Sequence, residues 1–171
     1  MLSFDLRTLD AHAVQVDDVL AADDAVWADE DPRPAGGIHV TGRLSTAGAG
    51  RFYFSGRIEG QLDAECRRCL TEVRSAVSEE AHAVFADADD AEVDTDPDVY
   101  RLDPRAQELD LRPAIREQWM LSAPAFVECR PDCAGLCPTC GANRNDGECG
   151  CTPTAADPRW DALRKLRGQT S

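Results

Sequence analysis

Hydrophobic and polar residues alternate along much of the first 86 positions. The alternation is clear over residues 38–45 (IHVTGRLS), stops at TAGAG over 46–50, and resumes over 51–65 and again over 71–86. A period of two residues is typical of strands that bury one face. We therefore predict an antiparallel β-meander, in which glycines within 51–65 mark places where a long strand can bend.

The same alternation suggests which side chains face the core. In the segment 71–86 the inward candidates are Val73, Ala76 or Val77, and Val84. Residues 12–27 (HAVQVDDVLAADDAVW) predict one further strand followed by a short helix.

A longer helical period appears after residue 99. Over residues 110–124, the apolar residues Leu111, Ile115 and Trp119 recur at helical spacing, continued by Met120 or Ser122, and form a stripe typical of a core face. Asp110 is the expected N-cap, with a proline in the first turn and another at the end. Residues 157–167 (DPRWDALRKLR) predict a second short helix, capped by Asp157.

Charge separates the two parts of the chain. Residues 87–98 (DADDAEVDTDPD) carry seven acids and no base, as expected for a solvated linker. The predicted organisation is a β-rich part over 1–86, an acidic linker over 87–98 and a cysteine-rich part over 99–171. The predicted fold class is α+β, with an antiparallel β-rich N-terminal part and a helical, zinc-knuckle C-terminal part packed together as one domain.

The formal net charge of the chain is −14. Proteins that bind nucleic acid through phosphate contacts usually have the opposite sign. The acidic balance suits solubility, or binding of a basic protein partner. The N-terminus, MLSFDLRTLD, lacks the features of a signal peptide, and no apolar run is long enough to span a membrane, so we expect a cytoplasmic protein.

Eight cysteines carry the strongest chemical signal in the sequence. Two lie in CRRC and six crowd into residues 129–151, and CPTCG within this run is typical of a knuckle that turns two sulfurs toward one ion. In a reducing compartment, cysteines at this spacing more often bind metal than form disulfides. The predicted metal ligands are Cys66, Cys69, Cys129, Cys133, Cys137, Cys140, Cys149 and Cys151.

These cysteines can fill two four-thiolate zinc sites with none left over, so one or two zinc ions are expected. The pairing stays open at this point. One layout joins Cys66 and Cys69 to two C-terminal cysteines, which would tie the tail to the β-rich part. The neighbouring Arg67, Arg68 and Arg130, with one further arginine at 144, would offset the negative charge of the sites.

Sequence patterns of catalysis are missing. The chain has no phosphate-binding glycine loop with a lysine, no H-E-x-x-H and no G-x-S-x-G. The three histidines, His12, His39 and His82, are distant in sequence from the cysteine run. We therefore expect a noncatalytic protein.

The order of CRRCL, a helix, C…DCAGLCPTCGANRN…CGC and DPRWDALRKL resembles the YceD family of large-ribosomal-subunit RNA accumulation proteins. The similarity is loose in the β-rich part and specific from Cys129 to Leu166. Family members commonly have leucine between the two asparagines, where this chain has Arg144. The positions that match the pattern are Gly135, Leu136, Cys137, Pro138, Cys140, Gly141, Asn143, Asn145, Asp157, Pro158, Arg159, Trp160, Leu163 and Leu166.

The resemblance implies support of 23S rRNA accumulation and of large-subunit assembly. In many bacteria the family's gene lies beside one for a small, basic ribosomal protein, so the implied partner is such a protein or a pre-50S particle. Some members lack the cysteines, which implies that the metal supports the tail rather than the family's shared activity. The alternatives are an RNA-binding zinc module and a thiol-based redox switch that releases zinc.

Overall fold

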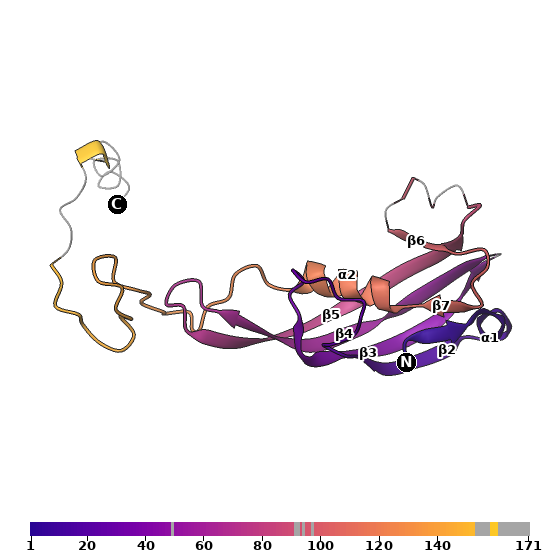
Figure 1. Ribbon diagram of the computed structural model, residues 1–171, viewed down its shortest axis with the longest axis horizontal. Coiled ribbons are helices and arrows are strands. Elements are labelled where there is room, and N and C mark those ends of the chain that lie inside the picture. Colours follow the sequence, from indigo (N-terminus) through magenta and orange to yellow (C-terminus); the bar gives the residue numbers. More distant parts are fainter. Residues whose placement is uncertain (49, 91–92, 94, 97, 153–157, 161–171) are drawn as a thin grey trace, which may run out of the picture. The chain divides into compact units, whose positions relative to one another are not determined.

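Five strands form the main sheet of the protein, in the spatial order β2-β3-β4-β5-β6 (Figure 1). The computed structural model describes residues 1–48, 50–90, 93, 95–96, 98–152 and 158–160. Antiparallel pairing joins β2 to β3 and β3 to β4, whereas β6 pairs with the end of β5 in parallel. The strands are β2 (Val14–Leu20), β3 (Pro34–Gly48), β4 (Arg51–Glu65), β5 (Glu72–Asp87) and β6 (Val99–Leu102).

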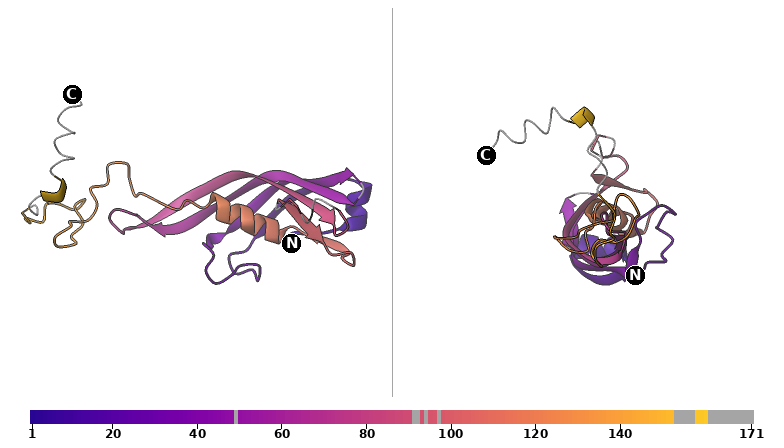
Figure 2. Two further views of the ribbon diagram at one scale, coloured as in Figure 1. Left: turned by 90° about the horizontal axis from the view of Figure 1, so that it is seen from above. Right: turned by 90° about the vertical axis from the view of Figure 1, so that its left-hand side faces the viewer.

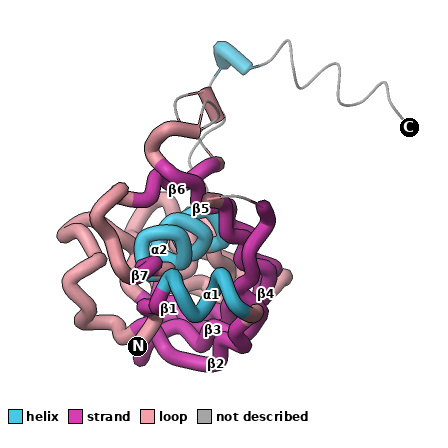
Figure 3. The backbone as a smooth tube through the Cα atoms, turned by 90° about the vertical axis from the view of Figure 1, so that its right-hand side faces the viewer, coloured by secondary structure: helices cyan, strands magenta, loops and turns pink. Residues whose placement is uncertain are grey.

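Two short strands and two helices complete this part of the chain. A separate antiparallel pair consists of β1 (Ser3–Asp5) and β7 (Glu108–Asp110), and α1 (Leu6–Ala11) follows β1 directly. Helix α2 (Arg112–Ser122) follows β7. Seen end-on, the sheet curves around α2 (Figure 3), and the left-hand view of Figure 2 shows α2 running beside the long strands.

Trp119 of α2 is the largest fully buried side chain of the core. It is fully buried, and its indole N–H donates to the carbonyl oxygen of Pro32 at 2.6 Å. On β4, a Cβ added to Gly60 would lie 2.8 Å from the Trp119 ring. The absence of a side chain at Gly60 is therefore what lets the helix approach the sheet.

The cores of the strands follow the predicted alternation. The sequence correctly places strands at 38–45, 51–65 and 71–86, and the apolar stripe of Leu111, Ile115 and Trp119 is buried as predicted. Within β5, Val77 faces the core, together with Ala81, Ala83 and Phe85. The prediction that Val84 faces inward is wrong: it is only half-buried, because the buried residues on either side of it occupy the core-facing register.

Two further expectations are corrected. The short helix predicted after β2 is absent, because Asp24 and Asp31 accept backbone N–H groups of Val26 and Ala28 and so fix turns there. Helix α2 has Leu111 at its N-cap position, and Asp110 instead accepts the backbone N–H of Arg112 at 3.0 Å. Strands β6 and β7 were not anticipated.

Beyond α2, the helical character predicted for the cysteine-rich part over 99–171 is not supported in the residues that the structure describes. Residues 128–152 contain turns and one isolated β-bridge, Leu136 with Asn143. A short 3₁₀ turn covers Pro158–Trp160. The rest of the helix predicted over 157–167 lies outside the described residues.

The chain divides into two units. The first comprises Met1–Ala64 and Glu72–Val127, and the second comprises Glu65–Thr71 and Glu128–Ser171. These units do not divide the chain at residues 87–98, and the acidic linker expected there stays a prediction. Within that segment, Asp90 forms an ion pair with Arg51 of β4 at 2.6 Å. Among the described residues, no helix has the length and apolar character needed to cross a membrane.

Candidate metal centre

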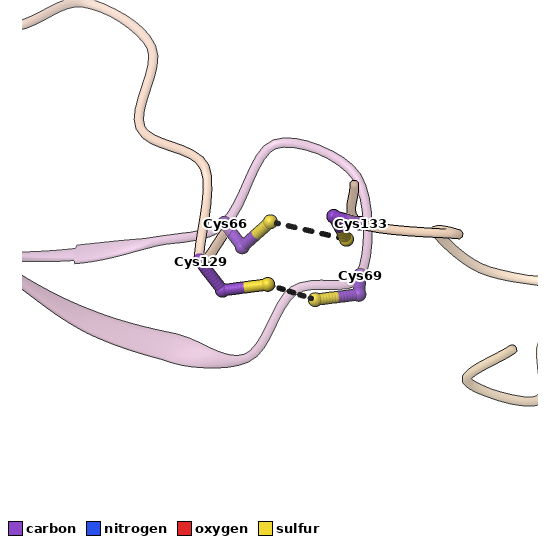
Figure 4. A group of neighbouring side chains, drawn as sticks. All are labelled: Cys66, Cys69, Cys129 and Cys133. Carbon is purple, nitrogen blue, oxygen red and sulfur yellow. Dashed lines mark hydrogen bonds between the residues drawn. The ribbon is translucent and has the colours of Figure 1, made fainter. Parts of the chain in front are cut away.

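The first pair of cysteines lies in the turn between β4 and β5. The backbone N–H of Cys66 donates to Thr71 O, and that of Leu70 donates to Cys66 O, each at 2.9 Å. Leu70 has a φ of 58°, a left-handed conformation that reverses the chain within a few residues. The turn points the sulfurs of Cys66 and Cys69 toward each other, and Cys66 faces Cys133 while Cys69 faces Cys129 (Figure 4).

The four sulfurs of this first cluster have the spacing of a metal site. Cys66 Sγ lies 3.8 Å from Cys133 Sγ, and Cys69 Sγ lies 3.6 Å from Cys129 Sγ. All four sulfurs lie within 4.8 Å of one another. Sulfurs bound to one zinc at about 2.3 Å in a tetrahedron are about 3.8 Å apart, whereas a disulfide needs about 2.05 Å. The geometry therefore fits one central ion and no disulfide.

Hydrogen bonds lower the pKa of two thiols of the first cluster, whereas the pKa of a third is raised. The backbone N–H of Cys129 is the main cause that lowers the pKa of Cys66 to about 6, and the side chain of Asn145 lowers the pKa of Cys133. The pKa of Cys129 rises to about 12, because its sulfur is removed from water and hydrogen-bonds to the neighbouring sulfurs. Four thiolates this close repel one another, so complete ionisation requires a cation among them.

The remaining cysteines form a second cluster, which consists of Cys137, Cys140, Cys149 and Cys151, again with all sulfurs within 4.8 Å of one another. A tight hairpin carries the first two: the N–H of Cys137 donates to Ala142 O at 2.8 Å, and the N–H of Gly141 donates to Cys137 O at 2.9 Å. Gly141 has a φ of 73°, which favours glycine.

The second cluster shows the same division of acidity as the first. Backbone N–H groups of Cys140 and Thr139 lower the pKa of Cys137 to about 6. Hydrogen bonds with the sulfurs of Cys140 and Cys149 raise the pKa of Cys151 to about 12. Cys137 is buried, whereas Cys140 is exposed, so this cluster is open to solvent on at least one side.

The structure thus brings all eight predicted cysteines together, and it settles the grouping that the sequence left open. That these cysteines bind metal stays a prediction. The histidines lie elsewhere: His39 contacts Asp17 at 2.7 Å, and His82 contacts Tyr53 at 2.9 Å. None of the three histidines joins either cluster within the part of the chain that the structure describes.

The four arginines expected to offset the charge of the sites differ in their partners. Arg67 donates to Glu128 at 2.8 Å, and Arg130 pairs with Asp132 at 3.4 Å. The positive charges of Arg67 and Arg130 are therefore partly neutralised by carboxylates rather than by the cysteine sulfurs. Arg68 and Arg144 have no ion pair within the described residues.

Sequence reasoning named Asn145 only as a position that matches the family pattern and missed its role at the site. Its Nδ2 donates to Cys133 Sγ at 3.3 Å, and its Oδ1 accepts the backbone N–H of Ala134 at 2.8 Å. A signal existed in the sequence, since Asn143 and Asn145 are the only asparagines of the chain and both lie between cysteines of one cluster.

The fold and the site define a class: a mostly β-sheet protein with two four-cysteine clusters that could each hold a metal ion. Comparison with known families makes this specific. Residues 54–167 match the family described as large ribosomal RNA subunit accumulation protein YceD, and the chain belongs to this family. The match spans both clusters.

Curated relatives are similar to this chain over only part of their own length. Uncharacterized proteins of Mycobacterium tuberculosis and Mycobacterium bovis are each 31% identical to this chain over 117 residues, which is 68% of the chain and 56% of each relative. The aligned part is thus little more than half the length of these relatives. No solved structure matches the chain significantly.

Proposed function

We propose that this protein is a noncatalytic factor that supports accumulation of 23S rRNA and assembly of the large ribosomal subunit. The observation that carries the proposal is the family match over residues 54–167, which includes every cysteine of both clusters. The family's description names the accumulation of large-subunit RNA. The proposed role is to hold a component of the subunit during assembly.

Zinc is the metal proposed for both clusters. Thiolate sets of four favour zinc or iron–sulfur chemistry over magnesium or calcium, which prefer oxygen ligands. In the first cluster, sulfur distances of 3.6 and 3.8 Å fit a single ion bound by all four sulfurs, and the sulfurs of the second cluster also lie within 4.8 Å of one another. A site with four protein ligands leaves no open position for water, which supports a structural rather than a catalytic role.

The proposed partner is a basic ribosomal protein, free or in a pre-50S particle. A chain with a net charge of −14 attracts a cationic protein and accelerates their encounter. Ribosomal proteins that bind RNA through lysine and arginine carry a positive charge that an acidic partner can pair with before RNA is present. Binding of this kind weakens as salt screens the charges.

Affinity purification tests the proposal. The tagged full chain, kept reduced and supplied with zinc, is used to recover partners from cells at low and high salt. We expect identified large-subunit proteins or precursor particles containing 23S rRNA in the low-salt sample and their loss at high salt. A low-salt sample that lacks both would contradict the proposal.

A second candidate is direct RNA binding by the cysteine-rich unit. The observation in its favour is that Arg68 and Arg144, both beside cysteines, have no ion pair among the described residues. The overall charge opposes it. Binding of purified 23S fragments with a steep salt dependence, in the absence of any protein partner, would favour this candidate over the first.

A further inference from the structure

Asn145 links the two cysteine clusters through a set of short hydrogen bonds. It lies in the loop between Cys140 and Cys149 of the second cluster, yet its Nδ2 donates to Cys133 Sγ of the first cluster at 3.3 Å. Its Oδ1 accepts from the backbone N–H of Ala134 and from Arg130 Nη2, each at 2.8 Å. The amide is therefore fixed at both ends against the segment that carries Cys133.

The hairpin of the second cluster determines where Asn145 lies. Asn143 forms a β-bridge with Leu136 at the base of this hairpin, next to Cys137. Asn143 Oδ1 then accepts both the backbone N–H of Asn145 at 3.0 Å and its Nδ2 at 2.8 Å. Closing the hairpin, which brings Cys137 and Cys140 together, thus also places the amide of Asn145.

We infer that Asn145 couples the clusters, so that a metal ion bound at one raises the affinity of the other. This inference rests on the proposed metal binding. A hydrogen bond to a ligand atom fixes the direction of the ligand and stabilises its charge, and its loss typically weakens metal binding about 10- to 100-fold. Coupling of binding free energies is reciprocal, so each cluster tightens the other by the same factor.

The positions of the ligands also assign an order of loading. The second cluster draws all its ligands from residues 137–151, whereas the first joins residues 66–69 to 129–133. Shorter loops cost less entropy to close. The second cluster therefore loads first and presents Asn145 to Cys133, which prepares the first cluster for its metal.

A double-mutant cycle on the full chain tests the coupling. Cys140→Ser with Cys149→Ser disables the second cluster, and Asn145→Ala removes the link. The affinity of the first cluster for Co²⁺ and Zn²⁺ is measured by competition with a chromophoric chelator, with the thiolate-to-Co²⁺ absorption as a direct signal. We expect the cysteine substitutions to weaken the first cluster about tenfold with Asn145 present and less than about twofold in the Asn145→Ala background.

Two further variants separate the hydrogen bond from general disruption. Asn145→Asp retains an oxygen that can accept from Ala134 but cannot donate to Cys133 Sγ, so it should uncouple the clusters as Asn145→Ala does. Arg144→Ala alters the exposed neighbour between the two asparagines and should leave the coupling unchanged.

Equal weakening in both backgrounds, or none in either, would overturn the inference while leaving two bound metal ions and the proposed function intact. A chain that binds no metal at all would overturn the inference together with the proposed metal sites. The number of metal ions bound per chain would show this directly.

Discussion

At the scale of single residues, the decisive feature is the acidity of the cysteines. The folded chain lowers the pKa of Cys66 and Cys137 to about 6, from an ordinary value of 9.0. A group whose pKa is depressed by folding stabilises the folded form fully above its unfolded pKa, and this stabilisation is lost as the pH falls through the folded pKa. Metal binding follows the same direction, because ligation requires the thiolate.

We therefore expect the cysteine-rich unit to retain metal at pH 8 and to lose both metal and order as the pH falls and protons displace the metal from the thiolates. Metal retained after dialysis at each pH, together with NMR signals of residues 128–152, measures this. Signals of the sheet residues serve as an internal control and should persist at pH 6. Retention of metal and order that is independent of pH between 8 and 5 would contradict the account.

The cysteines also show which features of the site the sequence could predict and which it could not. The eight cysteines were recognisable from their spacing, because C-x-x-C pairs constrain the backbone locally. Their grouping was not, since Cys66 and Cys133 are 67 positions apart in the sequence and meet only in the folded chain. The role of Asn145 escaped prediction for the same reason: asparagine has many roles, and only the position of its amide beside a sulfur distinguishes this one.

At the scale of elements, long periodic segments were predictable and short ones were not. The alternation in β4 and β5 extends over 15 and 16 residues, and this length makes the period unmistakable. Strand β6 has four residues, and its parallel pairing with β5 depends on contacts distant in sequence. The aspartates after β2 favoured turns over the expected helix by binding backbone N–H groups locally.

The contact between α2 and β4 gives a prediction for stability. Trp119 is fully buried over Gly60, and its N–H has a partner, so Trp119→Ala leaves a large cavity and removes a hydrogen bond. We expect the free energy of unfolding to fall by about 3–5 kcal/mol, a large part of a typical domain's stability. Chemical denaturation of the full chain followed by circular dichroism measures it.

Met120→Ala provides a matched control on the same helix. Met120 is 41% exposed, so its truncation should cost well under half as much. Equal losses for Trp119→Ala and Met120→Ala would show that α2 does not pack on the sheet as described.

At the scale of the whole molecule, the protein combines a sheet with an ordinary apolar core and a cysteine-rich unit that has few apolar residues. Buried apolar side chains are concentrated in the first unit, and the described residues of the second are mainly small, polar or cysteine. Structural zinc provides roughly 10–16 kcal/mol of apparent binding free energy, which is enough to fold such a segment. The order of the second unit should therefore depend on metal, while that of the first should not.

Metal content per chain, combined with removal of the metal, tests the central claim most directly. The protein purified under reducing conditions should contain two zinc ions per chain, and a strong chelator should remove them and abolish the NMR dispersion of residues 128–152 while the sheet stays folded. A cysteine-rich unit that contains no metal, or that keeps its structure after complete chelation, would contradict the account.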